Sequence, residues 1–103
     1  MELKVIPWTS ETPPTEEELR EDLVEQQLKV FHWANEPDDV YAGHTHGYHK
    51  IIYVVKGSIN FDFPTRQKSV NLKAGDRLEV PAGVRHSAAV GPEGVVCLEA
   101  HVY

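Results

Sequence analysis

Hydrophobic and polar residues alternate along most of the chain, and this pattern predicts short β-strands. The clearest case is residues 58–63, where Ile59, Phe61 and Phe63 alternate with polar neighbours. Turn-forming residues separate the predicted strands, which we place at 1–8, 29–34, 40–46, 48–56, 58–63, 68–72, 77–80, 86–90 and 95–102. Strands of this number and spacing favour an all-β sandwich or barrel.

Glycine-containing segments mark the turns between these strands. Gly57-Ser58 predicts a tight turn between two strands, and residues 91–94 (Gly-Pro-Glu-Gly) predict a second one. Residues 73–76 form a third, whose Gly75 suits a positive backbone angle. We therefore expect the chain to reverse at each of these points.

One segment departs from the periodicity of two. Thr15 and Glu18 are spaced as a capping box, which predicts the start of a helix over about residues 16–28. Its apolar residues form one narrow stripe, made of Leu19, Leu23, Val24 and Leu28. We expect this helix to dock on the sheet as a flank.

Residues 48–56 are apolar on both faces. Ile52 and Val54 point to one side of the predicted strand, while Ile51, Tyr53 and Val55 point to the other. A strand of this kind must be covered on both sides, so we expect it at the centre of the structure.

Length and charge restrict the class of protein. A chain of 103 residues has room for one core, so we expect a single domain, with a strand and flanking helix at 1–28 and a barrel at 29–103. The net charge is −6, of which residues 16–25 carry −5, as expected for a solvated helix face. The chain has no basic stripe for nucleic acid and no apolar segment of membrane-spanning length. We expect a soluble, cytoplasmic protein, with the lone Cys97 compatible with a reducing compartment.

Histidines provide the candidate chemistry. His44 and His46 are two residues apart in a predicted strand, so both imidazoles leave the same face. Buried imidazoles need hydrogen-bond partners or a cation. His86, on a later strand, is a third candidate for the same face.

Two spaced motifs carry these histidines. The first is His44-x-His46 followed by position 50 and Gly57, and the second is Gly75-x5-Pro81-x-Gly83-x2-His86. Together they resemble the two motifs of the cupin superfamily, whose small barrels are jelly rolls (double-stranded β-helices). The resemblance covers residues 44–86. It implies an all-β cupin jelly-roll barrel with one N-terminal helix, and a metal inside the barrel held by His44, His46 and His86.

The resemblance also implies the cofactor and the assembly. Three imidazoles with open positions suit one divalent transition metal, namely Zn, Fe, Ni, Mn, Co or Cu. Cupin barrels often pair, and pairing would cover Ile51, Tyr53 and Val55, so we expect a homodimer.

Lys50 departs from the family pattern, because the first motif has a glutamate at this position. Lys50 has the same strand parity as His44 and His46, and its ammonium cannot bind a metal. Three outcomes are open: it bends toward solvent; it stays inside, with a lowered pKa or with a carboxylate partner, as a general base or electrophilic group; or it attracts an anionic ligand together with the metal. His49 would be a fourth ligand only if a bulge turned it inward.

Other residues have both a structural and a functional interpretation. His32 and His101 are expected to be exposed or hydrogen-bonded strand residues. Cys97 shares a strand face with Glu99 and His101, which suggests a thiol site, although a lone cysteine among apolar residues is usually a core residue. Three aromatic residues are expected either to line a pocket mouth or to pack in the core: Trp33, Tyr41 and Tyr48. Ala88 leaves space near His86.

Two functions follow from the resemblance. The first is a metal-dependent enzyme of oxygenase or isomerase type acting on a small anionic molecule, in which Lys50 is the catalytic residue that steers or polarises the substrate. The alternative is a non-catalytic metal- or ligand-binding module that senses a small molecule. A purely structural barrel would bind no metal.

Overall fold

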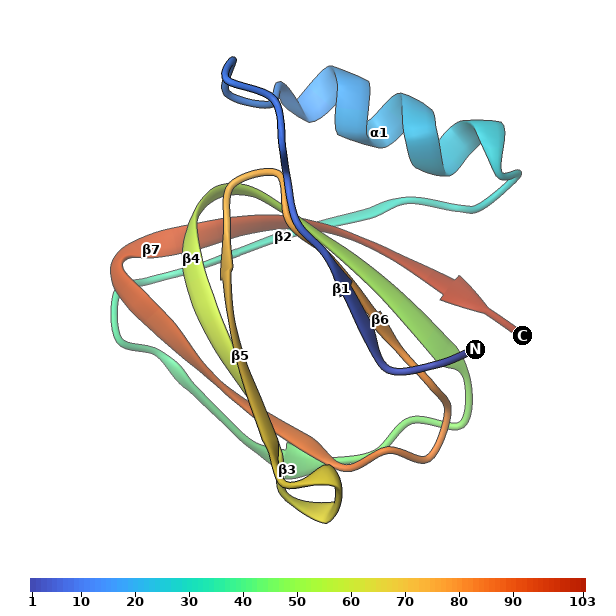
Figure 1. Ribbon diagram of the computed structural model, residues 1–103, viewed down its shortest axis with the longest axis vertical. Helices are drawn as coiled ribbons and strands as arrows, with labels where there is room; N and C mark the ends of the chain where they lie inside the picture. Colours follow the sequence, from blue (N-terminus) through green and yellow to red (C-terminus); the bar gives the residue numbers. More distant parts are fainter.

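The computed structural model describes all 103 residues as a β-barrel with one helix (Figure 1). The strands are β1 (Lys4–Ile6), β2 (Phe31–Asn35), β3 (Val40–His44), β4 (His49–Phe63), β5 (Lys68–Lys73), β6 (Arg77–Val80) and β7 (His86–Val102). Helix α1 spans Glu16–Glu25, and a 3-10 turn spans Pro64–Arg66. All strand pairs are antiparallel, in the order β1-β6-β4-β7-β2, with β3 beside β7 and β5 beside β4. The predicted all-β class with one N-terminal helix is confirmed.

β4 and β7 are long strands that bend and run through both layers of the barrel (Figure 1). Their first pairing zone joins residues 49–54 to 97–102, and their second joins 59–62 to 87–90. The predicted tight turns at Gly57-Ser58 and at residues 91–94 are therefore wrong, because the chain bends there without reversing. Gly57 (φ +82°) and Gly94 (φ +78°) lie at this bend, where the register between the strands shifts.

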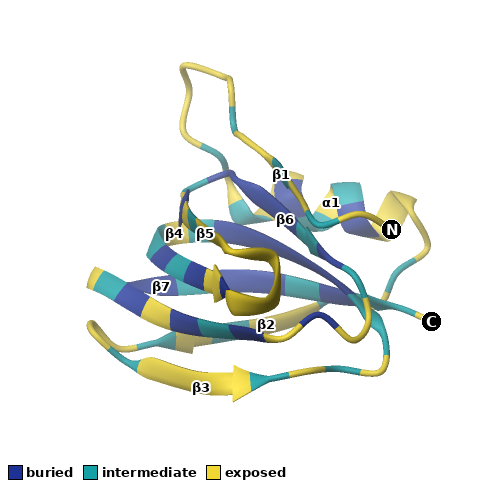
Figure 2. Cartoon of the chain, turned by 60° about the horizontal axis from the view of Figure 1, so that its bottom comes forward, coloured by how far each residue is buried: buried dark blue, intermediate teal, exposed yellow.

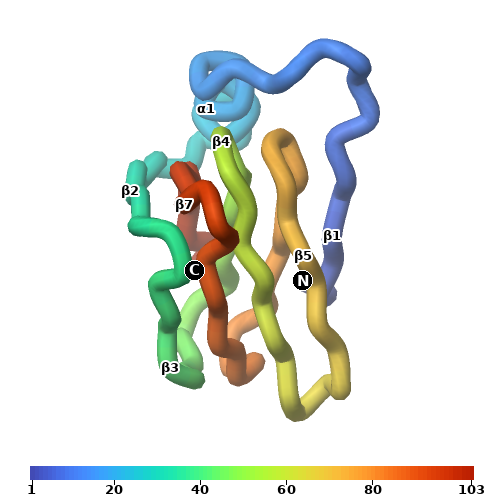
Figure 3. The backbone as a smooth tube through the Cα atoms, turned by 90° about the vertical axis from the view of Figure 1, so that its left-hand side faces the viewer, coloured from blue at the N-terminus to red at the C-terminus, as the bar shows by residue number.

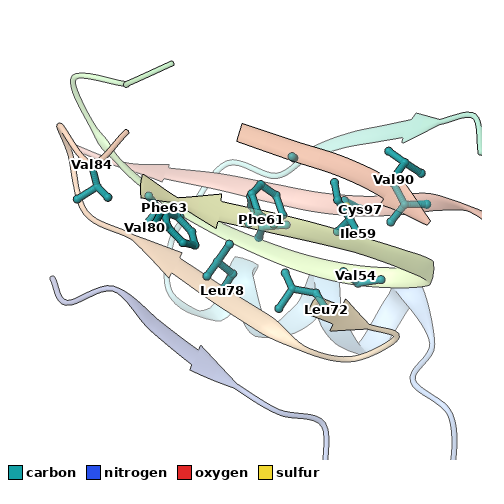
Figure 4. Packing of buried hydrophobic residues seen from close by; sticks show 13 residues of the cluster. Val54, Ile59, Phe61, Phe63, Leu72, Leu78, Val80, Val84, Val90 and Cys97 are labelled. Atoms are coloured by element: carbon teal, nitrogen blue, oxygen red, sulfur yellow. The ribbon is translucent and has the colours of Figure 1, made fainter. Parts of the chain in front are cut away.

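The main core lies between the two layers (Figure 4). Ile52 and Val54 point into it from the first half of β4, and Ile59, Phe61 and Phe63 point into it from the second half. The face assignments made from strand parity are confirmed for both segments. One end of this interior holds the candidate site.

Helix α1 covers the outer face of β4 and β7 (Figure 3). The predicted capping box is present, with Thr15 Oγ1 accepting from the Glu18 N–H and Glu18 Oε1 accepting from the Thr15 N–H. The helix ends at Glu25, three residues earlier than expected. With 10 residues, α1 is too short to span a bilayer, and the chain has no other α-helix.

The buried side of α1 is narrower than the predicted stripe (Figure 2). Leu19 and Leu23 pack in a second apolar cluster with Ile51, Tyr53, Leu98 and Ala100, and Leu28 and Val55 lie against it. Val24 is 56% exposed, so its place in the stripe was wrong. Because the helix covers Ile51 and Tyr53, the reason for expecting a second subunit on that face no longer applies. The homodimer stays a prediction.

A polar network holds the helix to the sheet around buried Arg77. Its guanidinium donates to Asp22 (3.1 Å) and Gln26 (3.3 Å) of the α1 segment, and to Glu79 (2.9 Å) on its own strand. The Tyr53 hydroxyl accepts from Arg77 (3.2 Å) and donates to Asp22. Charged donors and acceptors paired in this way fix where the helix lies on the sheet.

We expect Leu23→Ala to lower the free energy of unfolding by about 3 kcal/mol, because it leaves a cavity under the helix. Leu23 is fully buried. Val24→Ala removes a neighbouring apolar side chain that lies in solvent, and we expect a change within about 0.5 kcal/mol. Urea unfolding of both variants checks this, and equal losses would mean that α1 does not pack as described.

Candidate metal centre

Backbone geometry brings the three motif histidines together. His44 ends β3, His86 begins β7, and the two are direct cross-strand partners with ring centroids 4.5 Å apart. His46 follows in the loop, and its carbonyl accepts a bond from the Gly83 N–H (2.9 Å). Gly83 has φ +80°, a conformation that glycine adopts without strain. The turn of the second motif thus ties the loop of the first motif in place.

The hydrogen bonds of His44 and His86 fix which ring nitrogen faces the centre. His44 Nδ1 lies 2.7 Å from the Ala42 carbonyl oxygen, and His86 Nδ1 lies 3.0 Å from that of Val84. A carbonyl only accepts, so each Nδ1 carries the proton and each Nε2 keeps a free lone pair. Both rings therefore have the tautomer that a metal ligand needs.

His46 reaches the same tautomer through side chains. The Lys50 ammonium has no acceptor, so it donates to His46 Nε2 (3.2 Å). The His46 Nδ1–H then donates to the Tyr48 hydroxyl oxygen (3.1 Å). One ring nitrogen from each of His44, His46 and His86 lies within 4.8 Å of the other two.

This set of donors fits a divalent transition metal. Three neutral imidazoles are a common ligand set for such ions. The Lys50 bond to His46 Nε2 would have to break, since a nitrogen lone pair serves one partner. The residues present could therefore hold a metal, with Lys50 as a competitor for one ligand atom.

Lys50 lies inside the barrel, so the solvent-facing alternative is excluded. Its side chain is 11% exposed, and its Nζ lies 3.4 Å from Glu99 Oε1 as well as 3.2 Å from His46. Of the alternatives for Lys50, the structure has the one with a carboxylate partner. That partner is Glu99 of β7.

Sequence reasoning missed Glu99 as a site residue. Its parity with Cys97 and His101 suggested only a thiol site, yet its carboxylate faces the cavity. The register of β4 and β7 pairs Glu99 with Ile52, one of the inward residues next to Lys50. Strand parity could have shown that Glu99 points inward. The register between β4 and β7 was needed to show that Glu99 lies beside Lys50.

A cavity of about 210 Å³ adjoins the histidines. Its wall is mostly apolar, with a polar side made by His44, His86 and the Lys50–Glu99 pair. The lining residues are Trp33, Tyr41, His44, Lys50, Ile52, Ile59, Phe61, His86, Ala88 and Glu99. Benzene, with six carbon atoms, occupies an apolar cavity of about 150 Å³, so this one has room for a molecule of roughly eight non-hydrogen atoms.

The other candidates have separate roles. Trp33 and Tyr41 line the cavity, while Tyr48 supports His46. His49 accepts a bond from the Ala82 N–H (3.0 Å) and is not part of the histidine cluster. Cys97 belongs to the main core, where burial raises the pKa of its thiol, as expected for an inert core cysteine. His32 is an exposed residue near Glu16.

The surroundings of His46 and His86 keep both imidazoles neutral. Removal from water, the largest cause, and repulsion by the Lys50 ammonium and the neighbouring rings together lower the pKa of His46 to about 4. Burial also lowers the pKa of His86, and the bond to the Val84 carbonyl offsets part of this effect. At neutral pH neither ring has to lose a proton before it binds a cation.

We expect acid to destabilise the metal-free protein between pH 6.5 and about 4. In this range the unfolded chain protonates His46, whose ordinary pKa is 6.5, while the folded protein, in which the pKa of His46 is about 4, does not, so the free energy of unfolding falls as pH falls. We expect His46 to contribute a loss on the order of 1 kcal/mol by pH 5, after allowance for solvent screening, and the lowered pKa of His86 acts in the same direction. Urea unfolding in EDTA at pH 7.5 and pH 5 measures it. His46→Gln should flatten the dependence and His32→Gln should not; equal slopes in all three proteins would contradict the prediction.

The chain belongs to the cupin family, because the model of the cupin domain (Cupin_2) matches residues 31–101. An RmlC-like cupin from Shewanella frigidimarina is similar at 24% identity, with a TM-score of 0.63 over 72% of this chain and 64% of that one. The polyketide cyclase RemF from Streptomyces resistomycificus has 22% identity and a TM-score of 0.64 over 74% of this chain and 55% of that one.

An HTH_3 family transcriptional regulator from Vibrio cholerae has 17% identity and a TM-score of 0.62, over 78% of this chain and 45% of that one. These likenesses establish the fold. No curated protein matches the chain in sequence.

Proposed function

We propose that this cupin is a metal-dependent enzyme of oxygenase or isomerase type that acts on a small anionic molecule. The observation that carries the proposal is that His44, His86 and Lys50 line one cavity, while His46 completes the histidine cluster and contacts Lys50. His44, His46 and His86 would hold a divalent transition metal. When bound, such an ion supplies Lewis acidity and an open coordination position.

The chain's own residues give the proposal its substrate class. Lys50 donates to His46 and pairs with Glu99, and its third N–H is free for an acidic group of a ligand. Ile59, Phe61 and Ala88 offer the rest of the ligand an apolar wall that excludes water. A short carboxylate or enolate with an apolar body fits this combination.

The alternative is a non-catalytic module that binds or senses a small anion. It is favoured by the direct contact of Lys50 with His46 Nε2, since the cavity then holds a cation even without metal. The fold alone does not distinguish an enzyme from a binding module, because similar structures include both a polyketide cyclase and a transcriptional regulator. Turnover of a small-acid panel by zinc-, iron- or manganese-loaded protein favours the enzyme, whereas binding without conversion favours the module.

Metal content tests both functions against a purely structural barrel. After incubation with ZnSO₄ and gel filtration, we expect elemental analysis to find about one zinc per chain, as for other three-histidine sites. His86→Gln should weaken zinc binding at least about tenfold, because it removes a ligand. His49→Gln is the matched control and should bind like the wild type. No zinc in the reconstituted wild type would exclude both metal-based functions.

A further inference from the structure

Glu99 has three polar side-chain partners, more than any other residue that lines the cavity. Its Oε1 accepts from the Trp33 indole N–H (3.1 Å) and lies 3.4 Å from the Lys50 ammonium. Its Oε2 lies 2.6 Å from His101 Nε2, which is outside the cavity lining. The side chain is 12% exposed. Three donors from three strands thus fix one carboxylate between the cavity and the barrel end.

Stability alone does not account for this arrangement. A desolvated ion pair in an apolar wall is often no more stable than well-packed apolar residues of the same volume. Here the pair lies beside His44 and His86, whose Nε2 lone pairs are free, and Lys50 donates to the Nε2 of the third imidazole, His46. A role of the Lys50–Glu99 pair in metal or ligand binding would explain why these charges lie here.

The charge balance of the cavity indicates the role of Glu99. A divalent ion beside the Lys50 ammonium would give the cavity a charge of +3, and Glu99 reduces it to +2. The carboxylate also gives the ammonium a partner when a metal takes over His46 Nε2. In the family motif the acid lies at position 50 itself, whereas here it comes from β7.

We propose that Glu99 is the functional carboxylate of this site. It acts as a positioning residue that holds Lys50 at the cavity and offsets its charge, so that the three histidines bind a divalent metal and Lys50 stays available for an anion. The proposal rests on the proposed function, because it presupposes the metal. Glu99 itself is not a ligand in this scheme, since it lies outside the histidine cluster.

Zinc affinity, measured by competition with a chromogenic chelator, tests the proposal in four proteins. We expect Glu99→Gln to weaken zinc binding at least about tenfold, because the unbalanced ammonium repels the ion. Lys50→Met should strengthen it by about tenfold or more, and Lys50→Met/Glu99→Gln should return to within about threefold of the wild type, since the two effects act on one charge pair. Glu79→Gln removes another partly buried acid, paired with Arg77 on the outer face, and should change nothing.

Co²⁺ absorption separates a positioning role from direct ligation. The band positions of the Co²⁺-loaded protein should be the same in the wild type and in Glu99→Gln, because the ligand set is unchanged. A spectral shift would overturn the proposal by making Glu99 a ligand. Zinc affinity within twofold of the wild type in Glu99→Gln would overturn it too, while leaving the metal site intact. If the wild type binds no zinc, the proposed function and this inference both fall.

Discussion

Lys50→Glu is expected to raise zinc affinity by about a hundredfold, or about 2.7 kcal/mol. The change removes a cation that lies 3.2 Å from a ligand nitrogen and places a carboxylate there instead. The new carboxylate frees His46 Nε2 and can itself bind the ion. It also faces Glu99, so the metal-free variant holds two neighbouring carboxyl groups whose repulsion a bound metal ion relieves.

The same variant should show opposite changes with and without metal. In EDTA we expect its melting temperature to fall below that of the wild type, and with excess zinc we expect it to rise above it, because ligand binding stabilises the folded state. Pyruvate binding to the zinc-loaded protein should weaken, since the ammonium that pairs with its carboxylate is lost. Calorimetry measures both effects.

Two controls make this result specific. Lys56→Glu makes the same charge change on an exposed part of β4 and should leave zinc affinity within about twofold of the wild type, because solvent and salt screen it. Lys50→Met removes the charge without adding a ligand and should give an intermediate affinity. If Lys50→Glu and Lys56→Glu bind zinc equally, the ammonium of Lys50 does not compete with the metal.

Local sequence patterns were enough to predict which residues share a face. Parity along β4 assigned Ile52, Val54 and Lys50 to the interior, and the spacing of the second motif brought His86 to the first pair. Such patterns depend on the geometry of single strands and turns, which a few residues determine.

The partner of Lys50 could not be predicted in the same way. Glu99 reaches Lys50 because β4 and β7 pair in one particular register over a separation of about fifty residues. A different register would place another residue of β7 beside Lys50. Long-range register depends on the whole core and not on the local pattern, so the ion pair had to come from the structure.

The local sequence predicts turns at Gly57 and Gly94, where the structure has bends, for a related reason. Glycine with a positive φ occurs both in hairpin turns and in bulges of long strands, and the local sequence is the same in both. Which one forms depends on whether the strand finds partners on both sides of the glycine. β4 does, with β7 along both halves, so it continues through the bend.

We expect the stability of the protein to be most sensitive to an added methyl group at Gly57, where β4 bends. Comparison of Gly57 with Gly83 and Gly47 separates two causes, the strain of a positive φ and a clash with a neighbouring strand. Gly57 has φ +82°, and a Cβ added there would lie 2.1 Å from the Gly94 carbonyl oxygen. Gly83 has φ +80° but no atom within 4 Å of an added Cβ, and Gly47 has neither constraint. The Gly94 oxygen belongs to the backbone of β7, so relief requires the two long strands to move apart.

We therefore expect Gly57→Ala to lower the free energy of unfolding by about 3 kcal/mol or more, which corresponds to roughly 15 °C in melting temperature for a domain of this size. Gly83→Ala should cost about 1 kcal/mol, the strain of a positive φ alone, and Gly47→Ala should be neutral within about 0.5 kcal/mol. Urea unfolding of the three variants in EDTA gives these values without a contribution from metal. Equal losses at Gly57 and Gly83 would mean that strain in φ explains both, and that β4 and β7 do not approach as closely at the bend as described. A larger loss at Gly57 than at Gly83 would instead show that Gly57 lets β4 and β7 continue side by side from one layer to the other. The pairing of these two strands also brings Lys50 and Glu99 together beside the histidines.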